Sequence, residues 1–115
     1  MDFIYVKIPA SEALANREHT IHEALETALA ADAAGALIGW GASLEGVPKR
    51  RPVRVAFHRI DIEAPDARHA RGVLRRALAS LNLPPGTELH YSEDGVPLQE
   101  RLDADGWSAP QALLR

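Results

Sequence analysis

Residues 65–82, PDARHARGVLRRALASLN, carry the clearest helical pattern in the chain. Their apolar side chains recur at i, i+3, i+4, i+7, i+8 and i+11, and therefore share one face of a helix. These residues are Ala70, Val73, Leu74, Ala77, Leu78 and Leu81. Pro65 suits the first turn of such a helix, and Asp66 interacts favourably with the helix dipole there. The segment predicts an amphipathic helix that packs on a sheet.

A strand is predicted directly before this helix, in residues 53–63, VRVAFHRIDIE, which are rich in β-branched and aromatic side chains. A second strand and helix come earlier in the chain. FIYVKIP (residues 3–9) alternates as a strand does, and HTIHEALETALAADAAG (residues 19–35) has the period of a helix that ends at Gly35. ALIGWGASL (residues 36–44) and TELHY (residues 87–91) predict two further strands.

The predicted order is strand, helix, strand, strand, helix, strand. This order is α+β and typical of the ferredoxin-like split βαβ arrangement (βαββαβ), a four-stranded antiparallel sheet with two helices on one face. Its expected strand order is 4-1-3-2, and we expect this domain to span residues 1–94. Residues 95–115 are expected to form a short C-terminal helical tail, with Leu98 and Leu102 on one helical face, that packs on the domain or on a partner. The fold hosts many unrelated functions and therefore predicts none of them.

The composition is that of one globular domain of 115 residues, with 46% hydrophobic and 25% charged side chains. The net charge of −3 argues against nucleic acid and anionic membranes as partners. The absence of cysteine excludes disulfides, thiolate metal sites and cysteine nucleophiles. The sequence has neither the pattern of a signal peptide nor an apolar run long enough to cross a membrane. We therefore expect a cytoplasmic protein, and the preference for arginine over lysine indicates a bacterial source.

Aromatic side chains are predicted on the sheet face that the helices do not cover. If the helices cover the isoleucines of the first and third strands, Phe3, Tyr5 and Phe57 lie on the opposite face. A β-bulge near His58 would instead bring the large residues of the third strand onto one face. An apolar patch of this kind is seldom left to water. The sequence leaves open whether the tail, with Trp107, or a second subunit covers it.

The glycines of residues 36–46 invite comparison with a phosphate-binding loop. Gly39, Gly41 and Gly46 have the spacing G-x-G-x-x-x-x-G, which is not the dinucleotide fingerprint, and the next predicted element is a strand rather than a helix. We interpret them as bulges, or as positions of close backbone approach, in an edge strand. Trp40 lies between two of them and offers a stacking surface to a ligand or a partner.

The histidines are the side chains that can gain or lose a proton near neutral pH, and are therefore candidates for catalysis or metal binding. His19 and His22 stand three residues apart on a predicted helix, as two metal ligands can, but the sequence indicates no third ligand. His58 stands near the carboxylates Asp61 and Glu63, but no serine has a recognisable activating partner. We expect no metal and no cofactor, and the sequence favours a non-enzymatic role without deciding it.

Two functional hypotheses follow from these patterns. The first is a small bacterial regulatory domain that binds another protein or itself, in the manner of an antitoxin or an immunity protein. Its contacts would be the aromatic face, Trp40, and the helix arginines Arg71 and Arg75, which suit an acidic partner. The alternative is a dimeric ferredoxin-like enzyme or small-ligand binder, whose pocket on the sheet face would be lined by residues such as His58, His90 or Tyr5.

Overall fold

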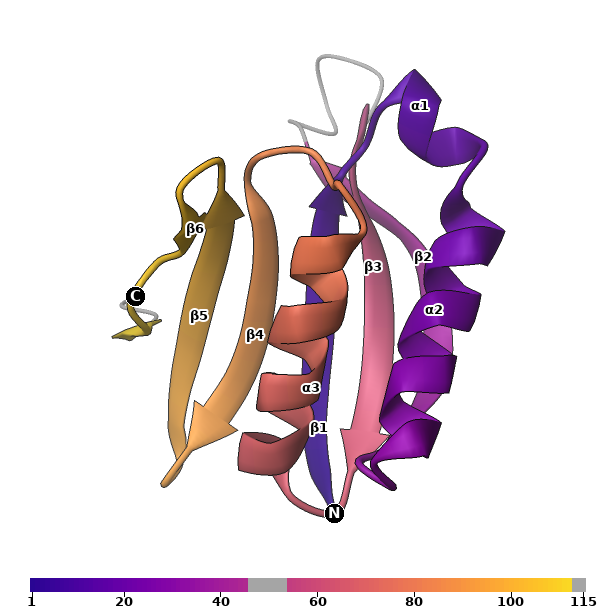
Figure 1. Ribbon diagram of the computed structural model, residues 1–115. Helices are drawn as coiled ribbons and strands as arrows, with labels where there is room; N and C mark the ends of the chain where they lie inside the picture. Colours follow the sequence, from indigo (N-terminus) through magenta and orange to yellow (C-terminus); the bar gives the residue numbers. More distant parts are fainter. Residues whose placement is uncertain (46–53, 113–115) are drawn as a thin grey trace.

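The computed structural model describes residues 1–45 and 54–112. Gly46 and the first residue of the predicted strand 53–63 lie outside the described residues. In chain order the elements are β1 (Asp2–Pro9), α1 (Glu12–Ala15), α2 (Glu18–Ala31), β2 (Ala36–Glu45), β3 (Arg54–Ala64), α3 (Ala67–Ser80), β4 (Thr87–Glu93), β5 (Val96–Asp103), β6 (Gly106–Trp107) and β7 (Gln111–Ala112) (Figure 1).

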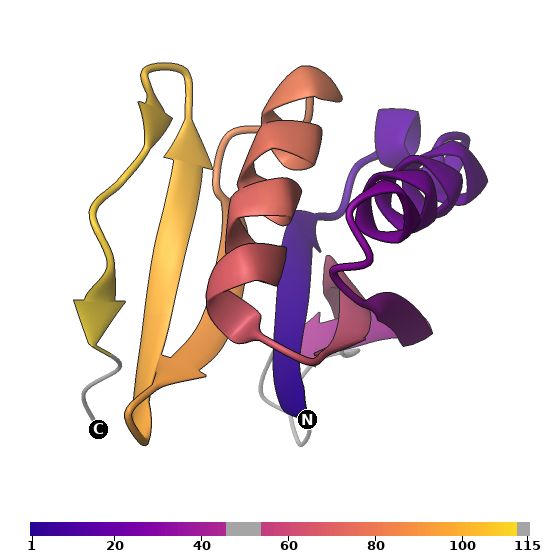
Figure 2. The same ribbon diagram turned by 60° about the horizontal axis from the view of Figure 1, so that its bottom comes forward.

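The strands form one antiparallel sheet in which β1 lies between β3 and β4. The order along the sheet is β2-β3-β1-β4-β5-β6, and β7 also pairs with β5. The predicted order of the first four strands, 4-1-3-2, is therefore confirmed. The long helices α2 and α3 pack against each other on the same side of the sheet (Figure 2). The opposite face of the central strands carries no described helix.

The predicted four-stranded ferredoxin-like sheet with two helices and a helical tail is wrong. The described residues form a seven-stranded antiparallel sheet with three helices, and the expected helical tail forms β5, β6 and β7. Leu98 and Leu102 are four residues apart, a spacing that fits one helical turn and two strand repeats equally well. In β5 they alternate with the polar residues around them and pack against the core.

A tight turn between β4 and β5 explains why residues 96–103 form a strand rather than the expected helix. Glu93 pairs with Val96, so Asp94 and Gly95 form a two-residue loop, and their φ angles are 51° and 79°. Two positive φ values are those of a type I′ turn, for which Asp-Gly is a preferred sequence. Because this turn matches the twist of paired strands, β5 runs antiparallel along the full length of β4.

The core fills the space between the sheet and the two long helices. Its fully buried residues come from every second position of the central strands and from one face of each helix. The largest are Ile4, Val6, Ile8, Ile21, Leu25, Leu29, Ile60, Ile62, Leu74, Leu78 and Leu89. Burying one side chain of this size stabilises the fold by about 1.5–3 kcal/mol. This core holds α2 in place above β2 and β3.

The register between β1 and β3 explains the mixed apolar pattern of β3. Pairing with β1 is continuous from Asp2 opposite Ala64 to Pro9 opposite Phe57, so of the two alternatives the one without a bulge at His58 holds for this pair of strands. His58 therefore shares the helix side of the sheet with the isoleucines, and Phe57 faces the other way. The irregularities of register lie between β2 and β3 instead.

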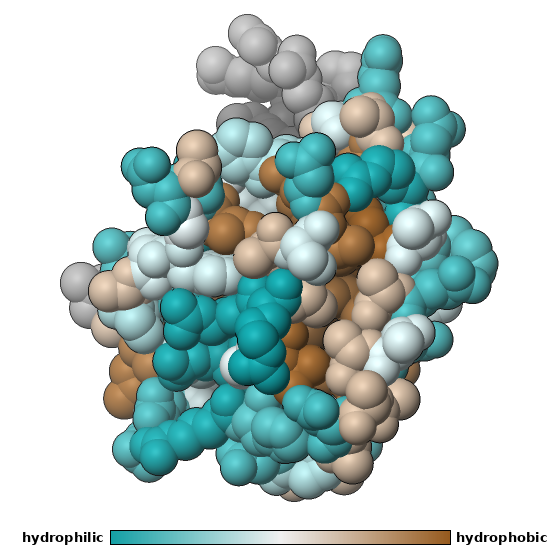
Figure 3. Space-filling view, in the orientation of Figure 1, coloured by the Kyte–Doolittle hydropathy of each residue, from teal (hydrophilic) through white to brown (hydrophobic). Residues whose placement is uncertain are grey.

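The surface on the helix side is uneven in polarity. Hydrophilic residues cover much of α3 and the neighbouring strands, and hydrophobic residues reach the surface between α2 and α3 (Figure 3). Among the residues whose burial is described, the exposed large hydrophobic side chains are Met1, Phe3, Ile38, Trp40 and Val96. None of the helices in the described segments is long and apolar enough to span a membrane.

Candidate functional site

β2 forms one outer edge of the sheet. It pairs with β3 on one side, and no described strand pairs with its other side. The register shifts between Leu37 and Gly39, which leaves Ile38 as the extra residue of a bulge. The predicted edge strand is therefore confirmed, whereas its bulge falls on Ile38 and not on Gly39 or Gly41. A Cβ atom added at Gly39 or at Gly41 would meet nothing within 4 Å, so the sheet face toward which side chains at these two positions would point is open.

Trp40 lies on the helix side of β2, in a row of four side chains. Its indole packs on the ring of His22 from α2, with the ring centroids 4.4 Å apart, and 59% of the residue remains exposed. His22 in turn contacts His58 of β3, and their Nε2 atoms are 2.7 Å apart. Glu18, at the start of α2, places a carboxylate oxygen 3.6 Å from Nδ1 of His58. Residues far apart in the sequence thus form one continuous array.

Burial keeps the two imidazoles of this row in their neutral forms near pH 7. Each residue is 6% exposed, and burial lowers the pKa of His22 and of His58. His58 lowers the pKa of His22 further, whereas Glu18 acts on both imidazoles in the opposite direction. The hydrogen bond between the two Nε2 atoms needs one donor and one acceptor, so at least one ring must be neutral for it to exist.

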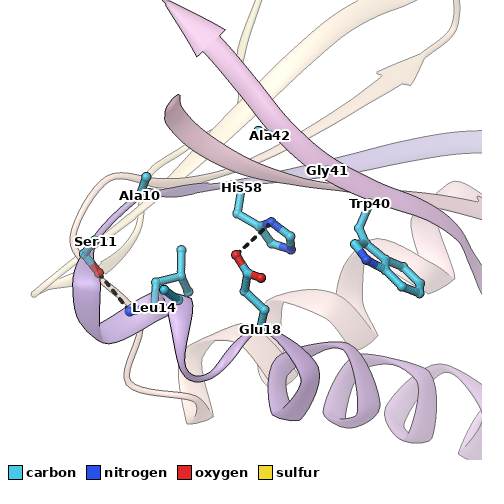
Figure 4. A pocket seen from close by; sticks show the side chains of 9 residues that line it. Ala10, Ser11, Leu14, Glu18, Trp40, Gly41, Ala42 and His58 are labelled. Atoms are coloured by element: carbon cyan, nitrogen blue, oxygen red, sulfur yellow. Dashed lines mark hydrogen bonds and ion pairs between the residues drawn. The ribbon is translucent and has the colours of Figure 1, made fainter. Parts of the chain in front are cut away.

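A pocket of about 270 Å³ opens beside this row (Figure 4). One wall is formed by α1 and the residue before it, with Ser11 and Leu14, and another by β2 with Trp40. Glu18 and His58 also line it, with their side chains directed toward each other. The Ser11 hydroxyl accepts a hydrogen bond of 3.1 Å from the Leu14 amide, which caps α1 and holds that wall in place. The pocket therefore combines apolar walls with one carboxylate and one imidazole.

The predicted pair of His19 and His22 is not brought together as metal ligands. His19 is exposed and pairs with Glu23 at 3.0 Å, whereas His22 is buried beside Trp40. Within residues 1–45 and 54–112, no three histidine or carboxylate side chains are grouped as the ligands of a metal ion would be.

Phe3, Tyr5 and Phe57 share the sheet face away from the helices, with Phe3 and Phe57 toward opposite ends of β1. Lys7 places its ammonium 4.2 Å from the ring centroid of Phe57, and the guanidinium of Arg59 lies 3.9 Å from that of Tyr5. Cations over aromatic rings stabilise such pairs electrostatically. Phe3 is 63% exposed, so the face presents one open aromatic ring among charged side chains rather than a broad apolar patch.

His90 of β4 also lies on this face, stacked on Tyr5 with the ring centroids 4.4 Å apart. Its Nε2 contacts a carboxylate oxygen of Glu88 at 2.7 Å, while its Nδ1 is buried and has no hydrogen-bond partner in the described residues. Burial lowers the pKa of His90, and the hydrogen bond with Glu88 opposes that shift. Because His58 faces the helices and His90 faces away from them, the structure does not join the two histidines in one pocket.

Arg71 and Arg75 hold a buried carboxylate of their own chain. Their Nε atoms lie 3.1 and 3.3 Å from the two carboxylate oxygens of Glu100 in β5. Tyr91 donates a hydrogen bond of 2.6 Å to the same group, whose side chain is fully buried. Burial, and then the bond to this carboxylate, raises the pKa of Tyr91. The two arginines thus attach α3 to the β4–β5 hairpin, and their contact with an acidic partner stays a prediction.

Sequence reasoning missed the role of Glu18 and the meeting of His22 with His58. The two histidines are 36 residues apart in the chain, and only the packing of α2 on β3 brings their rings into contact. One signal was present, because His58 has the same parity in its strand as Ile60 and Ile62 and must share their side of the sheet.

No family model, curated protein or solved structure matches this chain. The features that bear on function are therefore the outer edge of β2 and the pocket beside it.

Proposed function

We propose that this protein acts by binding another polypeptide, whose extended strand pairs with the outer edge of β2. The partner that fits best is a second copy of the chain, with the two β2 strands antiparallel. The observation that carries the proposal is a ten-residue edge strand whose outer side has no partner strand in the described residues. Strand addition of this kind joins two chains through main-chain hydrogen bonds.

β2 lacks two of the features by which exposed edges are usually protected, charge along the strand and proline, although it has a bulge at Ile38 and a charged residue, Glu45, at its end. Residues 36–44, ALIGWGASL, contain neither a charged side chain nor a proline. Gly39 and Gly41 carry no side chain, so neither residue crowds the backbone of an approaching partner. Ile38 and Trp40 are 54% and 59% exposed, so pairing would remove apolar surface from water as well as satisfy the edge backbone.

The other edge of the sheet is occupied by the chain itself. β6 and β7 pair with the outer side of β5. Between them, the Arg101 amide donates to the Ser108 hydroxyl at 2.9 Å, and the Ser108 amide donates to the Arg101 carbonyl at 2.8 Å. β5 also carries Pro97 and charged side chains, which discourage further pairing. β5 is covered by other strands and β2 is not, and this difference supports a binding role for the outer edge of β2.

A second copy suits this edge for reasons of symmetry and charge. A strand that pairs antiparallel with its own copy forms an isologous contact, which a twofold axis closes. Like charges that face each other across a strand pair are destabilising. Residues 36–44 are uncharged, so two identical edges meet without such repulsion.

The test is the mass of the full chain in solution, measured by light scattering on a sizing column. We expect a dimer for the wild type and a monomer for Ile38→Lys, because a lysine at this edge opposes strand pairing. Ile38 is more than half exposed, so the substitution leaves the core unchanged.

Val96→Lys is the matched control, since it places the same charge on an exposed apolar residue of β5. This variant should remain a dimer. A wild-type monomer at every concentration tested, or a dimer that Ile38→Lys leaves intact, would contradict the proposal.

A further inference from the structure

The charge that lines the pocket beside β2 is negative. Of the described residues that line it, Glu18 is the only one with a charged side chain at neutral pH, since burial lowers the pKa of His58 and keeps that imidazole neutral. The remaining lining is largely apolar, from Leu14 on one side and from Ala42 and the Trp40 indole on the other. A site with one carboxylate, an aromatic wall and no opposing cation favours a positively charged ligand.

Two polar atoms of the pocket, one on Glu18 and one on His58, face each other without a hydrogen bond between them. Oε1 of Glu18 lies 3.6 Å from Nδ1 of His58, which is longer than a hydrogen bond. Nε2 of His58 is already engaged by His22 at 2.7 Å. When His58 donates from Nε2 to His22, its Nδ1 carries a lone pair that points toward the carboxylate. One nitrogen donor between these atoms can lie about 2.8 Å from both.

We propose that this pocket binds a small primary amine in its ammonium form. The ammonium donates to the Glu18 carboxylate and to Nδ1 of His58, and the carbon chain of the amine lies against Leu14, Ala42 and the Trp40 indole. A carboxylate ligand is repelled by Glu18, and a quaternary ammonium lacks the N–H groups that the two acceptors need. The site lies on the helix side of the sheet and does not depend on pairing of the β2 edge.

Amide chemical shifts of the ¹⁵N-labelled full chain test this proposal, with n-butylammonium chloride as the probe at neutral pH. We expect saturable shifts centred on the pocket residues Ser11, Ala15, Gly41 and Ala42, with a dissociation constant near the millimolar range that suits a ligand of about five heavy atoms. Tetramethylammonium should bind several-fold more weakly, and sodium butyrate should leave these amides unchanged. Equal shifts from butyrate and from butylammonium would overturn the proposal.

Two variants test separately whether binding needs the charge of Glu18 and whether it needs the space of the pocket. Glu18→Gln keeps the shape of the half-exposed side chain but removes its charge, and should weaken butylammonium binding at least about tenfold. Ala42→Phe fills the pocket from the β2 side and should abolish the shifts. Glu23→Gln, an exposed change on the same helix, and Ile38→Lys should both bind as the wild type does. Unchanged affinity in Glu18→Gln, with its melting temperature preserved, would show that the carboxylate is not the binding group.

Discussion

Glu100 carries the fully buried carboxylate of the described residues. It is fully buried, and its carboxylate lies between the guanidinium groups of Arg71 and Arg75. A buried ion pair contributes little net stability, but removing one partner leaves an uncompensated charge in a poorly polarisable environment. The consequence is that α3 and β5 are coupled through one side chain.

Glu100→Gln should lower the free energy of unfolding by about 3 kcal/mol, as measured by urea denaturation. Asp103→Asn is the matched control, because Asp103 pairs with Arg101 where both side chains are at least half exposed and solvent screens the interaction. The control substitution should lower the free energy of unfolding much less. Equal effects of the two substitutions would mean that the arginines do not depend on Glu100 for their charge balance.

The sequence could place these arginines but not their partner. Arg71 and Arg75 lie off the apolar stripe of the helix, which correctly puts them away from the deepest core. Their carboxylate partner lies in a segment that the leucine spacing favoured as a helix, so the contact could not be foreseen. Long-range charge pairing of this kind depends on strand register, which a single sequence does not specify.

At the level of elements, the turns decide where the described chain departs from the predicted fold. The helix at residues 65–82 and the strands on either side were predictable, because their apolar periods extend over many residues. The β4–β5 hairpin rests on the dipeptide Asp94–Gly95, which is a recognised hairpin signal but was interpreted as the end of a strand. The pocket could not be predicted, because its walls come from α1, α2 and β2.

Two glycine substitutions should act in opposite directions. Gly95→Ala should lower the free energy of unfolding by about 1 kcal/mol, since its φ of 79° is unfavourable for a residue with a Cβ. Gly72→Ala in α3 should raise it by about 0.5–1 kcal/mol, because alanine favours a helix interior and its Cβ would meet the Arg76 side chain at an ordinary 3.6 Å. Thermal unfolding of both variants measures the difference. A Gly95→Ala variant as stable as the wild type would contradict the type I′ assignment.

At the level of the whole molecule, buried imidazoles on both faces of the sheet link stability to pH. Burial lowers the pKa of His22, His58 and His90 below the ordinary value of 6.5. In the unfolded chain these groups take up protons near 6.5, so below that pH the unfolded state binds more protons than the folded state. The stabilisation is therefore complete above pH 6.5 and is lost as the pH falls toward the lowered pKa values.

We expect the free energy of unfolding to be nearly constant above about pH 7 and to decline between about pH 6.5 and pH 5. Replacing both His22 and His58 with glutamine should make that decline shallower, because two of the three linked protonations disappear. Urea denaturation at a series of pH values measures the slope. His69→Gln on α3 is the matched control, and a slope that the double variant leaves unchanged would rule out this linkage.

The covering of β5 by β6 and β7 limits how far the sheet can grow from one copy to the next. In the described residues, the outer side of β2 is unpaired and that of β5 is covered. Two chains that meet through β2 therefore leave covered edges on both outer sides of the joint sheet. If chains pair through β2 as proposed, association should stop at two chains, because β6 and β7 cover β5 at the other end of each sheet.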